Sequence, residues 1–250
     1  MSRPQMKVVA SIEARMGSSR LPGKVLADIC GRPALGRLVD RLRKCRMIDD
    51  IVLATSISPI DHVLEEWARS EGLAVYRGSE DDVLDRVVGA HSFMGSDIVV
   101  EVTGDCPLLD PDVIDLGVET FFANDCEVVT NARVASYPQG ADVQVFEFEA
   151  LADVAARISD PAVREHVSLY FYETPSDYRI IHLIADRSRY SPELRLQLDY
   201  AEDLAFIREV YTHLLPLHGD SFGVREILQL LVSEPHLSRI NDCCTEKPLR

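Results

Sequence analysis

The feature that most constrains this chain is a stretch of small and basic residues directly after its first apolar run. Residues 8–12 read VVASI and predict a buried strand, and residues 14–24 read ARMGSSRLPGK. Glycine and serine let backbone N–H groups approach the oxygens of a bound anion closely. Arg15, Arg20 and Lys24 add positive charge in a chain whose formal net charge is −15. The pattern therefore predicts a polyphosphate site after the first strand.

Alternating apolar runs and amphipathic segments indicate the fold class. Strands are predicted at 8–12, 51–54, 98–102 and 127–130, with helical spacing between them. This alternation predicts an α/β fold with a doubly wound, mostly parallel, Rossmann-like sheet. The pattern changes after residue 130, and the second half reads as a small β-containing elaboration of the same sheet. The elements predicted there are strands at 143–146, 178–184 and 194–198, the last two paired, and helices at 148–157, 161–173, 201–214 and 223–232.

Length and composition limit the classes of protein further. We expect a single domain over residues 1–240, elaborated at 131–200, and a disordered tail at 241–250. The acidic balance argues against nucleic acid as a partner. No apolar run is long enough for a membrane span or a signal peptide, so we expect a cytoplasmic protein with no membrane partner. The six cysteines form no CxxC pair, which favours reduced thiols over zinc ligands.

Two common phosphate motifs fit the loop after the first strand poorly. The dinucleotide pattern GxGxxG is absent, because Gly17 and Gly23 stand alone. The P-loop pattern GxxxxGK[ST] is nearly present, but the spacing is one residue too long. Val25 also replaces the hydroxyl residue that binds magnesium in a P-loop. A P-loop nucleoside triphosphatase is therefore disfavoured.

The loop resembles the opening loop of sugar nucleotidyltransferases. The resemblance is closest to cytidylyltransferases of the spore-coat polysaccharide type, relatives of the acylneuraminate and 3-deoxy-manno-octulosonate enzymes. It covers residues 7–212 and is carried by five further stretches in the family's order. These are RGSEDDVLDR at 77–86, TGDCPLLD at 103–110, YPQGADV at 137–143, REHV at 164–167 and DYAEDL at 199–204. The resemblance implies the sheet of the nucleotide-diphospho-sugar transferases.

The resemblance also implies a reaction and a set of residues. An acceptor oxygen would attack the α-phosphorus of a nucleoside triphosphate, with CTP as the default donor, and pyrophosphate would leave. The implied acceptor is a sugar, sugar acid or small phosphorylated compound in surface polysaccharide or glycoconjugate biosynthesis. Arg15, Lys24 and Asp105 are the implied catalytic residues. The implied nucleotide-binding residues are Ile12, Glu13, Ala14, Arg15, Met16, Gly17, Ser18, Lys24, Asp85, Arg86, Thr103 and Gly104.

Two aspartates are the candidates for a magnesium site. Asp105 follows a predicted strand, and carboxylates at that edge of a parallel sheet face the usual ligand crevice. By resemblance Asp105 and Asp199 would bind Mg²⁺, the implied cofactor. Asp199 alone would also fit a helix N-cap, and Tyr200-Ala201 replaces the family's Thr-Pro beside it. Asp203 reads as a helix-face residue.

The acceptor and the base remain open in the sequence. By resemblance Tyr137, Gln139, Asp142, Arg164, Glu165 and His166 would bind the acceptor. The family usually has Arg or Lys in place of Gln139, which suggests a changed acceptor. It also usually has Gln in place of Glu13, and a carboxylate there accepts hydrogen bonds from guanine as well as from cytosine.

Other hypotheses follow from the same residues. A guanylyltransferase acting on a hexosamine 1-phosphate and a non-catalytic nucleotide-binding scaffold both need a triphosphate loop. A glycosyltransferase would use an Asp-x-Asp metal motif, which Asp110-Pro111-Asp112 matches only literally, because these residues are better explained as a helix start. Family resemblance also implies a homodimer that uses residues 131–200 as its acceptor-binding and dimerisation region.

Overall fold

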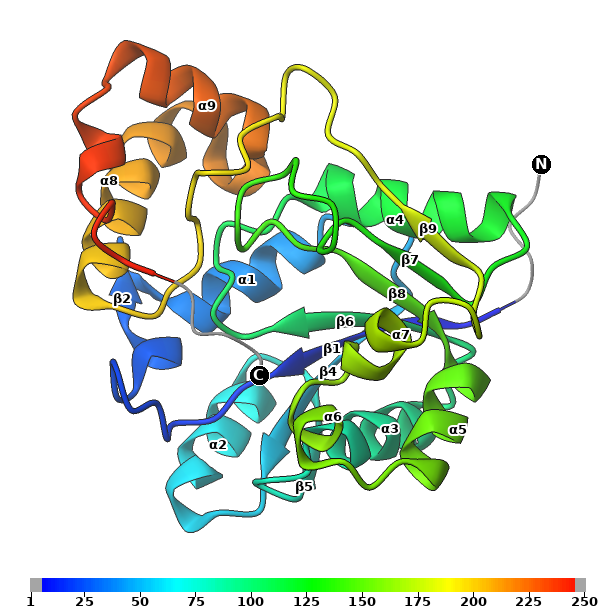
Figure 1. Ribbon diagram of the computed structural model, residues 1–250. Helices are drawn as coiled ribbons and strands as arrows, with labels where there is room; N and C mark the ends of the chain where they lie inside the picture. The colour runs from blue at the N-terminus through cyan, green and yellow to red at the C-terminus, as the bar shows by residue number, and fades with distance from the viewer. Residues whose placement is uncertain (1–5, 246–250) are drawn as a thin grey trace.

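A seven-stranded sheet runs through the middle of the molecule (Figure 1). The computed structural model describes residues 6–245. In sheet order the strands are β5 (Ala74–Gly78), β4 (Asp50–Ser56), β1 (Val8–Glu13), β6 (Ile98–Thr103), β8 (Gln144–Glu147), β7 (Val128–Thr130) and β9 (Ile180–His182). The first four strands are parallel, β8 is antiparallel to both of its neighbours, and β9 is parallel to β7. The predicted mostly parallel α/β sheet is confirmed.

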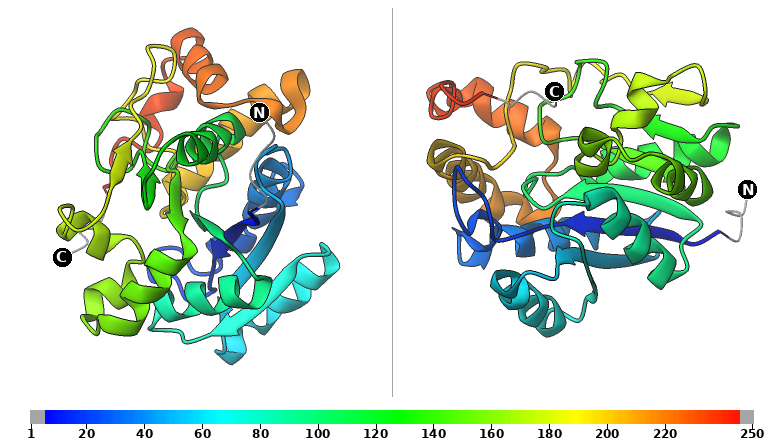
Figure 2. Two further views of the ribbon diagram at one scale, coloured as in Figure 1. Left: turned by 90° about the vertical axis from the view of Figure 1, so that its right-hand side faces the viewer. Right: turned by 60° about the horizontal axis from the view of Figure 1, so that its bottom comes forward.

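Helices cover both faces of this sheet, as Figure 2 shows from two further sides. One face packs against α1 (Ala34–Leu42), α2 (His62–Ser70) and α4 (Pro111–Ala123). The other packs against α3 (Val83–Met94), α5 (Phe148–Arg157), α6 (Pro161–Glu165) and α7 (Leu169–Glu173). Side chains alternate between the faces along each strand, so both faces of a central strand such as β1 are apolar.

The last two long helices form a core of their own beside the sheet. They are α8 (Ala201–His218) and α9 (Val224–Ser233), and they bury Phe206, Tyr211 and Phe222 against Leu196 and Leu198. A two-stranded hairpin, β2 (Asp28–Ile29) and β3 (Arg32–Pro33), contributes Ile29 to this core; the prediction missed this hairpin and β5. Short 3-10 turns complete the element order at Lys24–Leu26, Pro59–Asp61, Gly219–Ser221 and Leu237–Arg239.

Three predicted elements of the second half differ in the structure. The helix predicted over 161–173 is two helices, α6 and α7, because His166 leaves the helical conformation with φ −118° and ψ 96°. The paired strands at 178–184 and 194–198 do not pair. Instead β9 adds to the edge strand β7, and 194–198 is an extended connector with one bridge, between Gln139 and Arg195.

Asn241, the first residue of the tail predicted to be disordered, is instead buried. Asn241 is 4% exposed and donates hydrogen bonds to two other residues. Residues 246–250 lie outside the described part of the chain. Across residues 6–245, no helix is long and apolar enough to cross a lipid bilayer.

Asp110 joins the sheet helices to the C-terminal core. Its Oδ1 accepts a hydrogen bond from the backbone of Asp112 at 3.0 Å, which caps α4 as predicted. Its Oδ2 accepts the backbone N–H of Val224 at 2.9 Å, at the first residue of α9. One buried carboxylate therefore fixes the start of two helices.

We expect Asp110→Ala to lower the free energy of unfolding by about 1–2 kcal/mol, because it removes a cap and leaves the Val224 N–H unpaired. Chemical denaturation monitored by circular dichroism measures the change. Asp112→Ala, at a side chain that is 73% exposed, is the matched control and should change stability little. Equal stability of the two variants would contradict this role of Asp110.

Candidate active site

The candidate site lies where β1 and β6 end side by side. The backbone N–H of Gly104, just after β6, donates to the carbonyl of Glu13 at 2.8 Å. A Cβ on Gly104 would lie 2.9 Å from that carbonyl and 2.9 Å from the Cβ of Ala14. Glycine is therefore required for the close approach of the two loops.

Lys24 brings three distant segments together at this edge. Its Nζ donates to Oδ2 of Asp105 at 2.8 Å and to Oδ1 of Asp199 at 2.7 Å. Only 11%, 16% and 3% of the three side chains is exposed, respectively. The turn that carries Lys24 starts at Gly23, whose φ of 70° is left-handed and favours glycine. The structure thus joins three residues that the sequence singled out separately.

The two aspartates have further donors. Oδ1 of Asp199 also accepts from Nη2 of Arg20 at 2.7 Å, and Asp105 accepts from the side-chain amide of Gln197 at 3.3 Å. Burial by itself raises the pKa of Asp105, but the charge and hydrogen bond of Lys24 outweigh it and lower that pKa. Burial likewise lowers the pKa of Lys24, and the two aspartates raise it above its usual value. The contact is therefore a charged ion pair at neutral pH.

Asp199 is not the N-cap of α8, because Tyr200 occupies that position. Asp203 is fully buried, and its Oδ2 accepts the backbone N–H groups of Asp199 and Tyr200 at 2.9 and 3.0 Å. Reading Asp203 as a helix-face residue was wrong. The missed signal was its place as the third residue of α8, where an acidic side chain bonds back to the N-cap.

Asp61, a residue that the sequence analysis did not single out, holds the loop after β1 in place. Asp61 is fully buried, and its Oδ1 accepts the backbone N–H of Met16 at 2.6 Å. Ser56 donates its hydroxyl to the other oxygen of Asp61. Within the loop, the N–H of Ser18 bonds the Met16 carbonyl at 2.9 Å. These contacts fix the loop in place; Gly17 is exposed at its outer side.

Three other predicted nucleotide-binding residues lie in the loop after β1 and at the start of α3: Arg15, Asp85 and Arg86. Arg15 approaches Glu80 at 3.9 Å, and both side chains are more than 40% exposed. Arg86 is 3% exposed and donates Nη1 to the carbonyl of Ser79 at 2.6 Å, which holds the loop before α3. Asp85 is largely exposed. Among the described residues, none of these side chains bonds to the Lys24 ion pair.

The predicted acceptor residues fall into two groups. Arg164 donates Nε and Nη2 to Asp82 at 2.8 and 2.5 Å, which ties α6 to the cap of α3. The structure thus gives Arg164 a scaffold role; Glu165 is exposed and His166 ends α6.

The second group lies in the segment that leads into β8. The backbone of Gln139 bonds residues 194 and 196 at 2.8 and 2.7 Å, and Tyr137 is buried in the core. Asp142 lines a small cavity of about 40 Å³ together with Glu101, Thr103 and Gln144. That volume holds one water-sized group. Thr103 and Cys106, on either side of Asp105 in the chain, both line this cavity, so it lies beside the turn that carries Asp105.

Glu13 and Glu101 form a buried carboxyl pair on neighbouring strands. Glu101 is 6% exposed and accepts the side-chain amide of Gln144 at 2.9 Å. Burial raises the pKa of Glu13 to about 7, and the positive charge of Arg86 opposes this shift only in part. Burial also raises the pKa of Glu101. The nearby charge of Glu13 adds to that rise, and Oε1 of Glu13 has no hydrogen-bond partner among the described residues.

The donor set at Asp105 and Asp199 fits magnesium. Within residues 6–245 no group of three or more His, Cys, Asp or Glu side chains is placed to hold a metal, and Asp105 and Asp199 are two carboxylates that meet at one point. Magnesium is usually held by one or two carboxylates together with substrate phosphates and waters. Asp105 and Asp199 already converge on one cation, the ammonium of Lys24.

We expect Lys24→Met to lower the free energy of unfolding at pH 7 by roughly 3 kcal/mol, because it leaves Asp105 buried beside Asp199 without their shared cation. The pKa of Asp105 is depressed in the folded wild type, so this stabilisation exists above its usual value of 3.8 and is lost as pH falls. The gap between variant and wild type should therefore persist down to about pH 4 in thermal melts and narrow as the pH falls further. Lys44→Met, at an exposed lysine, is the control; a gap independent of pH would contradict the ion pair.

We expect Glu13→Gln to change how stability depends on pH. The folded pKa of about 7 exceeds the usual 4.5, so folded wild type binds more protons between these values and loses stability as pH rises through them. Glutamine does not titrate, and the variant should gain roughly 2 kcal/mol on the wild type between pH 5 and pH 8. Melting temperatures across that range measure this, with the exposed Glu149→Gln as control. A variant with the wild-type slope would contradict the raised pKa of Glu13.

Comparison with known proteins agrees with this geometry. The family model described as cytidylyltransferase matches residues 9–228. The chain is 34% identical over 245 residues to the uncharacterized protein MJ1063 of Methanocaldococcus jannaschii, covering 98% of each chain. It is 34% identical over 207 residues to the spore coat polysaccharide biosynthesis protein SpsF of Bacillus subtilis, covering 80% of this chain and 84% of that one.

A solved structure is similar over the whole chain. The structure of a cytidylyltransferase from Leptospira borgpetersenii superposes with a TM-score of 0.89 at 29% identity, covering 98% of this chain and 100% of that one. The family model spans the sheet, the loop after β1 and both aspartates that bind Lys24. The chain therefore belongs to the cytidylyltransferase family.

Proposed function

We propose that this protein is a Mg²⁺-dependent cytidylyltransferase that couples CTP to a small sugar, sugar acid or phosphorylated acceptor. An acceptor oxygen forms a bond to the α-phosphorus of CTP, and the bond from that phosphorus to the oxygen bridging the α- and β-phosphates breaks. Pyrophosphate leaves with the electron pair. The observation that carries the proposal is the convergence of Lys24, Asp105 and Asp199 beside the loop after β1.

Each residue of this group has a role that its chemistry supports. The ammonium of Lys24 and the guanidinium groups of Arg15 and Arg20 offset negative charge on the triphosphate. Asp105 and Asp199 would hold Mg²⁺, which when bound supplies further positive charge to the phosphates. The loop after β1 brings backbone N–H groups to the same edge of the sheet.

The small cavity beside Asp105 supports a hydroxyl-bearing acceptor. Its polar lining is Glu101, Thr103, Asp142 and Gln144, with no lysine or arginine among the described residues that line it. Carboxylates and amide oxygens accept hydrogen bonds, which sugar hydroxyl groups donate. In a cavity that holds one water-sized group, this lining favours a single hydroxyl group over a carboxylate or phosphate group.

Two features of the protein in the cell belong to the proposal. The relative named for spore coat polysaccharide biosynthesis supports a role in surface polysaccharide or glycoconjugate synthesis. The six cysteines are free thiols, which supports a cytoplasmic location. A homodimer through residues 131–200 rests on family resemblance.

No feature of the site favours the guanylyltransferase or the glycosyltransferase. Asp110, the first residue of the Asp-x-Asp sequence, caps α4.

The test is a matrix of nucleotides against acceptors. CTP, GTP, UTP and ATP are each combined with sugar acids, neutral sugars and sugar 1-phosphates, including a hexosamine 1-phosphate. We expect pyrophosphate release only with CTP, Mg²⁺ and one class of acceptor, and a cytidine monophosphate adduct by mass spectrometry. Release with GTP and the hexosamine 1-phosphate would support the guanylyltransferase instead. Nucleotide binding without release across the panel would support the scaffold.

We expect Asp105→Asn to abolish turnover, because the amide removes a negative charge from the proposed Mg²⁺ site. The same pyrophosphate assay measures the loss, and thermal melts confirm that the variant folds. Asp112→Asn, at an exposed carboxylate seven residues further along the chain, is the matched control. Wild-type turnover by Asp105→Asn would remove Asp105 from the reaction.

A further inference from the structure

Asp199 is held from behind by a buried arginine. Nη2 of Arg195 donates to Oδ2 of Asp199 at 2.7 Å, on the side of the carboxylate opposite the oxygen that meets Lys24. Arg195 is 5% exposed, and its Nε and Nη2 also donate to Asp203 at 3.0 and 3.3 Å. The planar guanidinium therefore spans two carboxylates, which a lysine ammonium cannot do with the same geometry.

Asp203 fixes the backbone of the same segment. Its Oδ2 accepts the N–H groups of Asp199 and Tyr200, and its Oδ1 accepts Nε of Arg195. Both the side chain and the main chain of Asp199 are thus held by groups that are themselves buried. The direction in which Oδ1 of Asp199 points is set by this pair.

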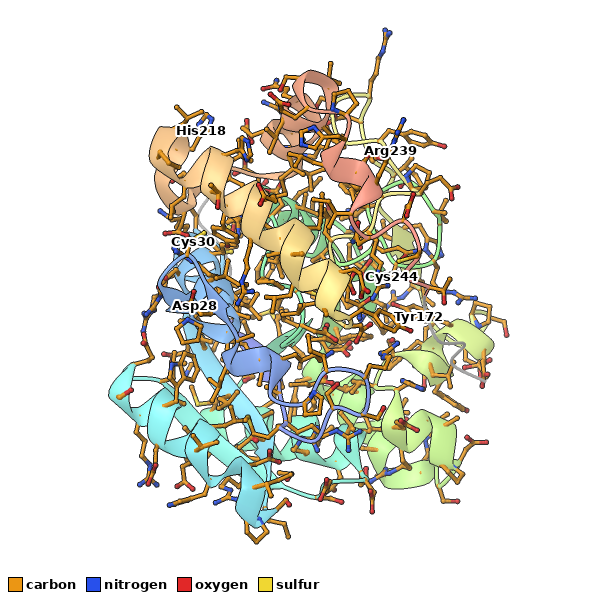
Figure 3. All side chains as sticks on the ribbon, turned by 90° about the vertical axis from the view of Figure 1, so that its left-hand side faces the viewer. Asp28, Cys30, Tyr172, His218, Arg239 and Cys244 are labelled. Carbon is orange, nitrogen blue, oxygen red and sulfur yellow. The ribbon has the colours of Figure 1, made fainter. Side chains whose placement is uncertain are left out.

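The C-terminal segment completes the arrangement. Asn241 is 4% exposed, and its side-chain amide donates to Oδ1 of Asp203 at 2.9 Å and to the carbonyl of Arg195 at 3.2 Å. Figure 3, in which Cys244 is labelled, shows this segment passing the N-terminal end of α8. Asn241 lies beyond residue 228, where the match to the family model ends.

We propose that Asn241 is a positioning residue of the active site, which acts through Arg195 and Asp203 to orient the carboxylate of Asp199 toward the metal and Lys24. The inference rests on the proposed role of Asp199 as a Mg²⁺ ligand. It makes the C-terminal segment part of the catalytic apparatus.

The orientation of Asp203 depends on how many hydrogen-bond donors its buried carboxylate has. Without the amide of Asn241, Oδ1 of Asp203 keeps only Nε of Arg195. A buried carboxylate that loses a donor recovers it by rotating or by admitting water. Rotation of Asp203 moves the guanidinium of Arg195, which is bound to both of its oxygens and also holds Asp199. Groups that orient metal ligands typically change metal affinity or activity by 10- to 100-fold when removed.

The experiment compares Asn241→Ala and Asn241→Asp with wild type and with Asp242→Asn. Asn241→Asp keeps the size of the side chain but replaces the amide donor with a second acid against Asp203. Asp242 is the exposed neighbour, so its variant changes charge without touching the network. Mn²⁺ serves as the probe, titrated by electron paramagnetic resonance in the presence of CTP. Steady-state kinetics with Mg²⁺ run well below the melting temperature.

We expect both Asn241 variants to bind Mn²⁺ roughly 10-fold more weakly and to lose a similar factor in kcat, with KM for the acceptor unchanged. Asp242→Asn should match wild type in all three. If Asn241→Ala does not fold, Asn241→Ser, which keeps a shorter donor, takes its place with the same expected result.

Variants that melt at lower temperature but keep wild-type Mn²⁺ affinity and kcat would overturn the proposal, because Asn241 would then only anchor the C-terminal segment. The failure of the proposed function looks different: wild type itself would bind no Mn²⁺ with CTP and release no pyrophosphate.

Discussion

The ammonium of Lys24 between two buried aspartates is the contact on which the rest of the site depends. It joins the loop after β1, the end of β6 and the segment before α8 at one point. Without the shared cation, Asp105 and Asp199 would place like charges close together in a partly dehydrated space, which is costly. In the proposed reaction Lys24 would exchange these carboxylates for phosphate oxygens, and the carboxylates would exchange Lys24 for the metal ion.

This contact needs support from outside the sheet. Parallel strands bring Asp105 to the usual ligand edge, but Asp199 comes from the connector that leads into the C-terminal core. Arg195 and Asp203 bind Asp199 from that side, and Asn241 binds them in turn. The sheet therefore supplies Asp105, and the segment that leads into the C-terminal core supplies Asp199. The position of Asp199 relative to Asp105 depends on how that core packs against the sheet.

The sequence predicted the parts that follow from local pattern. Apolar runs such as 8–12 and 98–102 became β1 and β6 because both faces of a central strand are buried. It failed at 194–198, which has the pattern of a strand but only one bridging partner, at Gln139. An apolar run indicates burial, and burial here comes from α8 and α9 instead of a neighbouring strand.

By itself the sequence determined the kinds of side chain available to the site and their order along the chain: the loop with Lys24, then Asp105, then Asp199. Only the tertiary structure decided which of them meet. The tertiary structure placed Glu13 beside Glu101 and bound Arg164 to Asp82. Motif resemblance had suggested only ligand contacts for Glu13 and Arg164. The reason is that hydrogen bonds and ion pairs between distant segments depend on the packing of whole elements, which residue spacing along the chain does not specify.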